Sequence, residues 1–404
     1  MSSHGVPRSE RDRSPEQLKR DLEKIEKYRA LESQFRHQVS DTQFDSVTLD
    51  LTTKLLRINP EYYTVWNARR RCLISGPLAT SCNKLLPLEA EISSTCEPHT
   101  LSEQTLETQL DHEEPRVGRP STAKNRGDES VNATDIKNYT AVISDELAFT
   151  VPLLMAHPKC YWIWNYRMWT LERAMLLLPL AAAKSIWQEE LGLVSKMLGR
   201  DRRNYHAWAY RRYVVSQLES DKLEGQSMAE PEFAYTTKMI KNDLSNFSAW
   251  HNRTQLIPKL LSERKADDTS RRAFLDNEFL MVGNGLNVGP EDQSLWYYHE
   301  YLILNVAEQQ EKMPIICPMT LSERIKLISR EIEFVKDLLE DYNDVKWIFK
   351  MLLEYTLLIH RLRNHPLGGN EKRELESWVA QIKKLDPQRS NRWNELAEEL
   401  CIAS

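Results

Sequence analysis

Two short stretches of this sequence combine polar and aromatic side chains at a spacing that could serve chemistry. They are HPKCYWIW, which contains Lys159 and Tyr161, and RRNYHAW, which contains Asn204 and His206. A lysine is a point charge on a flexible stem, which suits a negative charge that grows during a reaction. From the residues alone, however, Lys159 fits a solvated lysine at a helix start better. His206 fits a turn residue that hydrogen-bonds its own helix start as well as it fits a site residue.

The sequence contains no comparable pattern of residues that would bind a metal ion. Six cysteines are present, and no two of them stand as C-x-x-C: Cys72, Cys82, Cys96, Cys160, Cys317 and Cys401. No cluster of Cys, His and Asp has the spacing of metal ligands either. The sequence therefore predicts no metal site within this chain, and six cysteines in 404 residues do not make a disulfide scaffold.

Both stretches belong to a repeat that is anchored on a tryptophan. Five segments align on Trp66, Trp164, Trp208, Trp250 and Trp296, and the last four are 44, 42 and 46 residues apart. An aromatic residue stands three positions before the first four tryptophans, and an arginine stands three positions after them. In the fifth segment His299 replaces the arginine. Trp347 and Trp393 continue the rhythm without an arginine, as degenerate terminal units would.

Each repeat predicts a helical hairpin. Positions three apart lie on one face of a helix, so the aromatic residue, the tryptophan and the arginine should form a structural stack. The arginines are expected to bond carbonyls of the adjacent hairpin or to meet a partner subunit. Pro60 and Pro158 fall in the turns. A hairpin of about 45 residues cannot bury its own apolar face, so we predict an all-α fold, a right-handed α-α solenoid or crescent of stacked hairpins.

One interval is longer than the others. Trp66 and Trp164 are 98 residues apart, and the excess is polar and nearly free of aromatic residues, which predicts a disordered insertion. The predicted organisation is an N-terminal arm and first helix at 1–43, a first repeat at 44–78, the insertion at 79–139, further repeats at 142–176, 186–220, 228–262 and 274–308, and degenerate helical repeats at 315–404.

Composition limits the possible functions. The apolar fraction of 41% supports a sizeable core, and the net charge of −5 argues against a nucleic-acid binder that works by bulk charge. The first residues are charged and lack the apolar centre of a secretory signal. The longest apolar run, 174–183, is about half of a transmembrane helix and contains Pro179. We expect a cytoplasmic chain without stable membrane insertion.

The repeated pattern Asn/Asp-Pro-x-x-Tyr-x-x-Trp-x-x-Arg resembles the α-subunit repeat of protein prenyltransferases. Within that family, the early His4-Gly5, the segment LTTKLLRINPEYYTVWNARR and EDQSLWYY look most like the type-2 branch, which modifies Rab GTPases. The resemblance covers about residues 15–305 apart from the insertion. It implies an enzyme subunit that is active only with a β subunit, which holds the catalytic zinc and the lipid pocket. This chain alone would bind no cofactor.

The resemblance also implies a reaction and its residues. The enzyme would transfer a geranylgeranyl group from geranylgeranyl diphosphate to C-terminal cysteines of Rab GTPases that a Rab escort protein presents. Lys159, in the family's Pro-Lys-x-Tyr, would reach the diphosphate; Cys160 replaces the more usual Asn or Ser. Tyr161, Asn204 and His206 match positions at the rim of the same site.

Two readings compete with this one. The chain could be the α subunit shared by farnesyltransferase and the type-1 enzyme, although the His-Gly start disfavours it. It could also be a non-catalytic helical-repeat scaffold, although the tetratricopeptide period of 34 residues does not match. Two end signals are weaker: His4 could reach the partner's zinc as an autoinhibitory ligand, and the terminal Cys401-Ile402-Ala403-Ser404 has the C-a-a-X form of a prenylation site.

Overall fold

The computed structural model describes residues 14–79, 133–308, 315, 319–365 and 367–400, and within these ranges it contains helices and no strand. The chain divides into two compact units, Met1–Glu189 and Glu190–Ser404. The first contains α1 (Pro15–Ser40), α2 (Ser46–Ile58), α3 (Tyr63–Ser75), α5 (Ala133–Ala156), α6 (Tyr161–Leu177) and the beginning of α7 (Leu180–Arg200). The second contains the rest of α7, α8 (Tyr205–Leu218), η1 (Asp221–Leu223), α9 (Ala229–Asn242), α10 (Phe247–Glu263), α11 (Asp268–Val288), α12 (Gln293–Glu308), α13 (Leu321–Asp341), α14 (Lys346–Arg363), α15 (Gly369–Leu385), η2 (Pro387–Arg389) and α16 (Ser390–Glu399).

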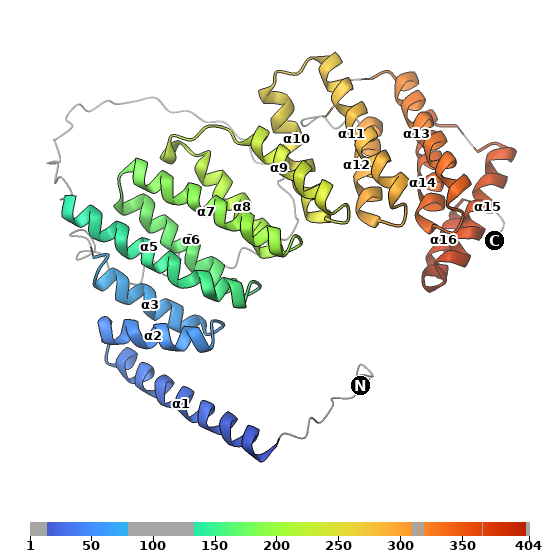
Figure 1. Ribbon diagram of the computed structural model, residues 1–404. Coiled ribbons are helices and arrows are strands. Elements are labelled where there is room, and N and C mark those ends of the chain that lie inside the picture. The colour runs from blue at the N-terminus through green and yellow to red at the C-terminus, as the bar shows by residue number, and fades with distance from the viewer. Residues whose placement is uncertain (1–13, 80–132, 309–314, 316–318, 366, 401–404) are drawn as a thin grey trace, which may run out of the picture. The chain divides into compact units, whose positions relative to one another are not determined.

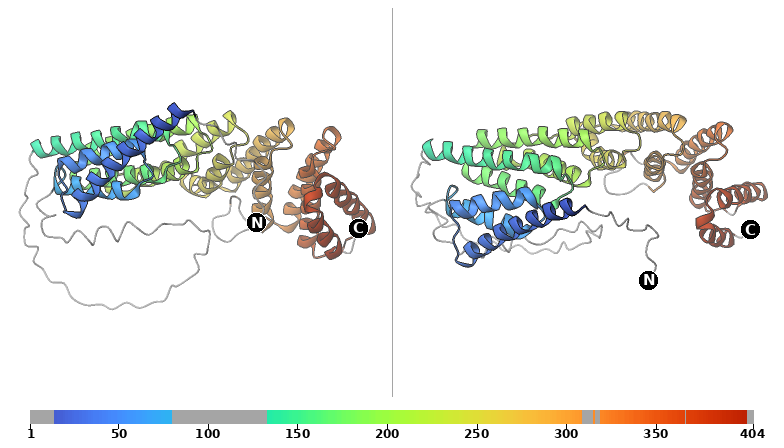
Figure 2. Two further views of the ribbon diagram at one scale, coloured as in Figure 1. Left: turned by 90° about the horizontal axis from the view of Figure 1, so that it is seen from below. Right: turned by 60° about the horizontal axis from the view of Figure 1, so that its bottom comes forward.

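Consecutive helices pack in pairs (Figure 1), and for α7 and α8 the contact is made by the part of α7 that belongs to the second unit, through Glu190 and Ser195. We name the pairs α2–α3, α5–α6, α7–α8, α9–α10, α11–α12 and α13–α14 the first to sixth hairpins. Neighbouring hairpins contact one another through their second helices, α3 with α6, α10 with α12 and α12 with α14. Figure 2 shows α1, α2 and α3 side by side from two further directions. The predicted all-α fold of stacked hairpins is confirmed.

The second helix of the chain illustrates why these segments fold as they do. The Asp45 carboxylate accepts hydrogen bonds from the backbone N–H groups of Val47 and Thr48 and so caps the start of α2. Leu51, Leu55 and Leu56 follow at helical spacing, and all three are buried. Burial of a leucine side chain contributes about 1.5–3 kcal/mol, so tertiary packing contributes more to this helix than its intrinsic propensity does.

The start of α5 differs from the predicted end of the insertion. Residues 133–139 were expected to belong to the insertion, but they form the first turns of a helix that begins at Ala133. The Tyr139 hydroxyl donates a hydrogen bond to the carbonyl of Ala79, 3.0 Å away, which attaches this helix to the end of the first hairpin. Polar composition alone did not reveal this anchor.

The helix α5 is also the one described helix that is long and apolar enough to cross a membrane by length and composition. The same helix contains Pro152 and the buried carboxylate of Glu146, and it packs along α6. A core helix of a globular protein passes the same test, and the ion pair of Glu146 described below fits that reading.

Candidate functional site

Each repeat tryptophan holds the turn in front of its own helix. The indole N–H donates a hydrogen bond to the carbonyl six residues earlier: Trp66 to Pro60 at 2.8 Å, Trp164 to Pro158 at 3.0 Å, Trp208 to Arg202 at 2.8 Å, Trp250 to Leu244 at 2.8 Å and Trp296 to Pro290 at 2.6 Å. The tryptophans are buried, as predicted. The candidate site residues lie in or directly after two of these turns.

The aromatic residues three positions before the tryptophans do not join the buried stack. Tyr63 is 53% exposed, whereas Trp66 is 1% exposed, and Tyr161, Tyr205 and Phe247 are exposed as well. They occupy the first position of their helices, where a side chain leans back past the end of the helix toward solvent. Within these four repeats, the predicted stack is therefore buried at its tryptophan and arginine positions, and its first aromatic position is exposed.

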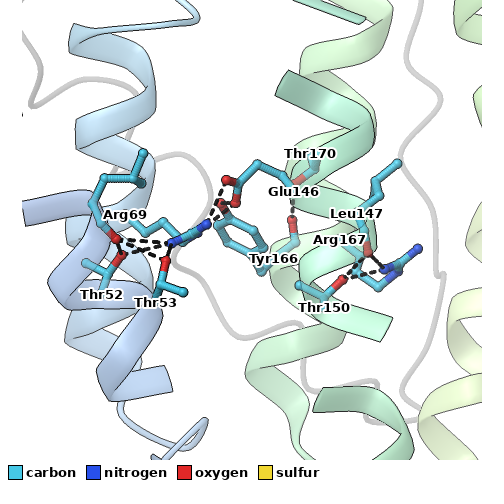
Figure 3. A network of polar contacts seen from close by, with 10 residues as sticks. Thr52, Thr53, Arg69, Glu146, Leu147, Thr150, Tyr166, Arg167 and Thr170 are labelled. Carbon is cyan, nitrogen blue, oxygen red and sulfur yellow. Dashed lines mark hydrogen bonds and ion pairs between the residues drawn. The ribbon is translucent and has the colours of Figure 1, made fainter. Parts of the chain in front are cut away.

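Three of the four repeat arginines, Arg69, Arg211 and Arg253, bind a glutamate of the following hairpin. Arg69 donates from Nε and Nη2 to the two carboxylate oxygens of Glu146 at 2.6 and 2.7 Å, and from Nη1 to the hydroxyls of Thr52 and Thr53 (Figure 3). Tyr166 donates its hydroxyl to the same carboxylate at 2.6 Å. Burial and the Glu146 charge raise the pKa of Tyr166 well above its ordinary value, so the hydroxyl keeps its proton and remains a donor.

This arrangement recurs in the second unit. Arg211 binds Glu232 and Arg253 binds Glu278 through the same two guanidinium nitrogens, at 2.6–2.8 Å. Arg167 also donates to the carbonyl of Leu147 and to Thr150 within the first unit. Leu147 belongs to the same hairpin as Arg167, so this bond is not the expected one to a carbonyl of the adjacent hairpin. In the adjacent hairpin, Arg69, Arg211 and Arg253 bind carboxylates, which were not predicted from the sequence.

The sequence does contain a signal for these partners. Glutamates stand 18 residues before the tryptophan of their own hairpin in four successive repeats, at Glu146, Glu190, Glu232 and Glu278. A carboxylate at the same position of an otherwise apolar helix is buried only with a partner, and the arginine of the preceding hairpin recurs with the same period.

Lys159 and Tyr161 lie together at the start of α6 in the first unit. Lys159 is exposed, and within the described part of the chain it makes no hydrogen bond, ion pair or ring contact. Tyr161 is 45% exposed, and its ring lies edge-on to the ring of Trp162 with centroids 5.3 Å apart. The turn presents a cation and a phenol to solvent.

Asn204 and His206 lie at the start of α8 in the second unit. Asn204 is only 2% exposed, and its side-chain oxygen accepts a hydrogen bond from the backbone N–H of Ala207 at 3.1 Å. This contact makes Asn204 the N-cap of α8. His206 is half-buried and contacts the ring of Tyr205 edge-on at 5.7 Å.

The structure says little about the two end signals and the cysteines. His4 and the terminal Cys401 to Ser404 lie outside the described residues. Burial raises the pKa of the Cys72 and Cys160 thiols to about 11, so both stay protonated. The described ranges contain no group of three or more His, Cys, Asp or Glu side chains that could hold a metal ion.

A mostly apolar cavity of about 340 Å³ lies in the second unit between α11 and α13. Phe279, Leu280, Gly283 and Phe334 supply its apolar wall, and Arg330 is among its polar lining residues. None of the residues that the sequence singled out for chemistry lines it.

Comparison with known proteins identifies the repeat. The protein prenyltransferase alpha subunit repeat matches residues 48–75, 143–174, 187–218 and 229–260. The geranylgeranyl transferase type-2 subunit alpha of Saccharomyces cerevisiae is 30% identical over 98% of this chain and 99% of its own length. The protein of the same name from Schizosaccharomyces pombe is 30% identical over 98% of both chains. The human protein of that name is 28% identical over 74% of this chain, and 41% of its length is covered.

Among solved structures, the Candida albicans protein geranylgeranyltransferase-I complexed with GGPP superposes with a TM-score of 0.57. The superposition covers 93% of this chain and 91% of that chain at 19% sequence identity, so it supports the fold of stacked helical hairpins alone.

Proposed function

The chain belongs to the protein prenyltransferase α-subunit family, as a geranylgeranyl transferase type-2 α subunit, and from this premise we propose that it is active as one half of an α/β heterodimer. The β subunit holds the lipid and the catalytic zinc, which lowers the pKa of the substrate thiol and so favours the thiolate. The α subunit completes the diphosphate end of the site. The heterodimer works in the cytoplasm.

The reaction transfers a geranylgeranyl group from geranylgeranyl diphosphate to the C-terminal cysteines of Rab GTPases, which an escort protein presents. The cysteine thiolate attacks the carbon that bears the diphosphate, a C–S bond forms, and the C–O bond breaks. The diphosphate leaves with the electron pair of that bond. Because its negative charge grows as the bond breaks, a cation placed beside it stabilises the transition state more than the ground state.

The observation that carries this proposal is that Lys159 is exposed and unpaired among the described residues. Its ammonium group is exposed and has no partner within the described residues, while the turn that bears it is held by the indole of Trp164. An unpaired lysine on a fixed turn keeps its charge available for an incoming anion. Tyr161 and His206 are the remaining exposed or half-buried rim residues, and Asn204 supports the helix start that bears His206.

The exposed aromatic residues fit the proposed partner. Tyr63 and Tyr161 in the first unit, and Tyr205 and Phe247 in the second, occupy the same position of their hairpins and are each 45–61% exposed. Large aromatic side chains at interfaces bury much area at little conformational cost. We assign these four residues to the contact with the β subunit.

The test is single-turnover prenyl transfer by the heterodimer with Rab, escort protein and radiolabelled geranylgeranyl diphosphate. Lys159→Ala should lower the chemical rate constant by about 10²-fold, with assembly and lipid binding intact, as expected for loss of one preorganised electrostatic contact. Lys54→Ala is the matched control, because Lys54 is also exposed but forms only a surface ion pair with Asp50.

An unchanged rate for Lys159→Ala would contradict the proposed role of the lysine. Replacing the Rab and escort protein by a short peptide tests the proposed substrate class. Efficient modification of a free C-a-a-X peptide, with no dependence on escort protein, would instead identify the shared α subunit of the farnesyl and type-1 enzymes.

A further inference from the structure

The turn that bears Lys159 is attached to the preceding hairpin by the residues on its C-terminal side. The Cys160 thiol donates a hydrogen bond to the carbonyl of Pro60, with Sγ and O 3.4 Å apart. The ring of Trp162 packs against the ring of Tyr63, with centroids 5.4 Å apart and planes inclined by 32°. Both contacts join the second hairpin to the start of the first hairpin's second helix, and both lie within the first unit.

The acceptor of the thiol is itself held in place. The Pro60 carbonyl also accepts the indole N–H of Trp66 at 2.8 Å, and Trp66 is buried. Cys160 is 2% exposed, and its burial raises the thiol pKa to about 11, so the S–H donor persists at neutral pH. The thiol is therefore a lasting donor to a rigid acceptor, although an S–H group is a weak donor.

The fourth hairpin shows what this position does in another repeat. Asn246 donates from Nδ2 to the Arg202 carbonyl of the preceding turn at 3.1 Å, and its Oδ1 accepts the backbone N–H of Ala249 at 3.2 Å. It links two hairpins and caps its own helix. Cys160 makes the link but no side-chain cap of α6. At Cys160, the residue next to Lys159, this position therefore keeps the link between hairpins and loses the helix cap.

We propose that Cys160 and Trp162 are positioning residues that clamp the Lys159 turn to the first hairpin. The inference rests on the proposed role of Lys159 at the diphosphate. Lys159 makes no hydrogen bond, ion pair or ring contact of its own within the described residues, so the backbone on which it stands determines where its charge can reach. The first hairpin, which contributes none of the proposed site residues, thereby takes part in the reaction.

The experiment measures single-turnover transfer by the assembled heterodimer at saturating and limiting geranylgeranyl diphosphate. We expect Cys160→Ala to lower the saturated rate constant about threefold to tenfold and Trp162→Leu about tenfold, with little change in lipid half-saturation. Cys160→Asn should restore most of the rate, because an amide can donate to Pro60 as Asn246 does to Arg202. Cys72→Ala is the control, since it removes a thiol that is also 2% exposed but lies inside α3.

The same variants are then combined with Lys159→Ala. If the clamp acts through the lysine, neither Cys160→Ala nor Trp162→Leu lowers the rate further in that background. An equal further loss, or normal rates for both single variants beside a slow Lys159→Ala, would overturn the clamp. A normal rate for Lys159→Ala itself would overturn the proposed function instead. If Cys160→Ala fails to assemble, Trp162→Leu alone decides, because Trp162 is only partly buried.

Discussion

The fourth and fifth hairpins are joined by a different chemistry from the fifth and sixth. At the first joint Arg253 binds Glu278 through two hydrogen bonds at 2.6 and 2.7 Å. At the second joint His299 lies between the Glu331 carboxylate, at 3.1 Å, and the Tyr355 hydroxyl, at 2.8 Å. An arginine is always charged and requires an anion when buried, whereas a histidine can also be neutral.

The second joint therefore tolerates loss of its carboxylate better than the first does. Glu278 also accepts the Tyr298 hydroxyl, so its removal leaves a buried guanidinium and a buried phenol without that partner. Removal of Glu331 leaves His299 hydrogen-bonded to Tyr355. Toward the degenerate C-terminal repeats, the chain replaces an obligatory ion pair by an optional one.

The largest expected effect is at the arginine joint. Glu278→Ala should lower the free energy of unfolding by about 3–5 kcal/mol, because it strands a buried charge. The matched variant Glu331→Ala should cost about 1–3 kcal/mol, the usual cost of an unsatisfied buried donor. Urea unfolding of the heterodimer, compared at equal subunit concentration, gives both values. Equal costs at the two joints would remove the distinction between them.

A smaller effect should appear in the pH dependence of stability. Burial by itself raises the pKa of Glu331, but hydrogen bonding and attraction by His299 and Arg330 outweigh it, and the net pKa lies below the ordinary value. A carboxylate with a depressed pKa stabilises the fold above its unfolded pKa, about 4.3, and this stability is lost as the pH falls through the folded pKa.

The comparison is therefore between wild type and Glu331→Gln, which cannot titrate. The urea midpoint of wild type should fall more steeply than that of the variant as the pH is lowered below about 4.3. Parallel curves would show that Glu331 does not contribute in this way. Glu278→Gln, measured alongside, reports whether the arginine joint differs.

The smallest effect should come from an exposed pair of the same type. Arg264 binds Glu230 with Nε and Oε1 2.6 Å apart, but the two side chains are 43% and 58% exposed. Arg264→Ala should change the free energy of unfolding by less than about 1 kcal/mol, because water and salt screen the pair. A cost close to that of Glu278→Ala would mean that geometry rather than burial decides the strength of these pairs.

Much of the fold follows from one periodic motif. The tryptophans predicted buried hairpin helices, and each proved to hold its own turn through the carbonyl six residues earlier. The partners of the arginines were harder to foresee, because Arg69 and Glu146 are 77 residues apart and separated by the insertion. The exposure of Tyr63 could not be predicted, because helical spacing shows which residues share a face and not where the helix begins.

The candidate site was less accessible to sequence reasoning than the fold. Lys159 could be singled out only through the family resemblance, since a lysine at a helix start is ordinarily solvated. The capping role of Asn204 and the link from Cys160 to Pro60 depend on distances between turns. Local patterns cannot supply those distances.

The pairing of Arg69, Arg211 and Arg253 with later glutamates also sets an order in which contacts form during synthesis. On the ribosome Arg69 is made 77 residues before Glu146, and Arg253 is made 25 residues before Glu278. At about 5–20 residues per second, Arg69 waits roughly 4–15 seconds for its carboxylate. Until its glutamate is synthesised as part of the next hairpin, each of these three arginines lacks its counter-ion.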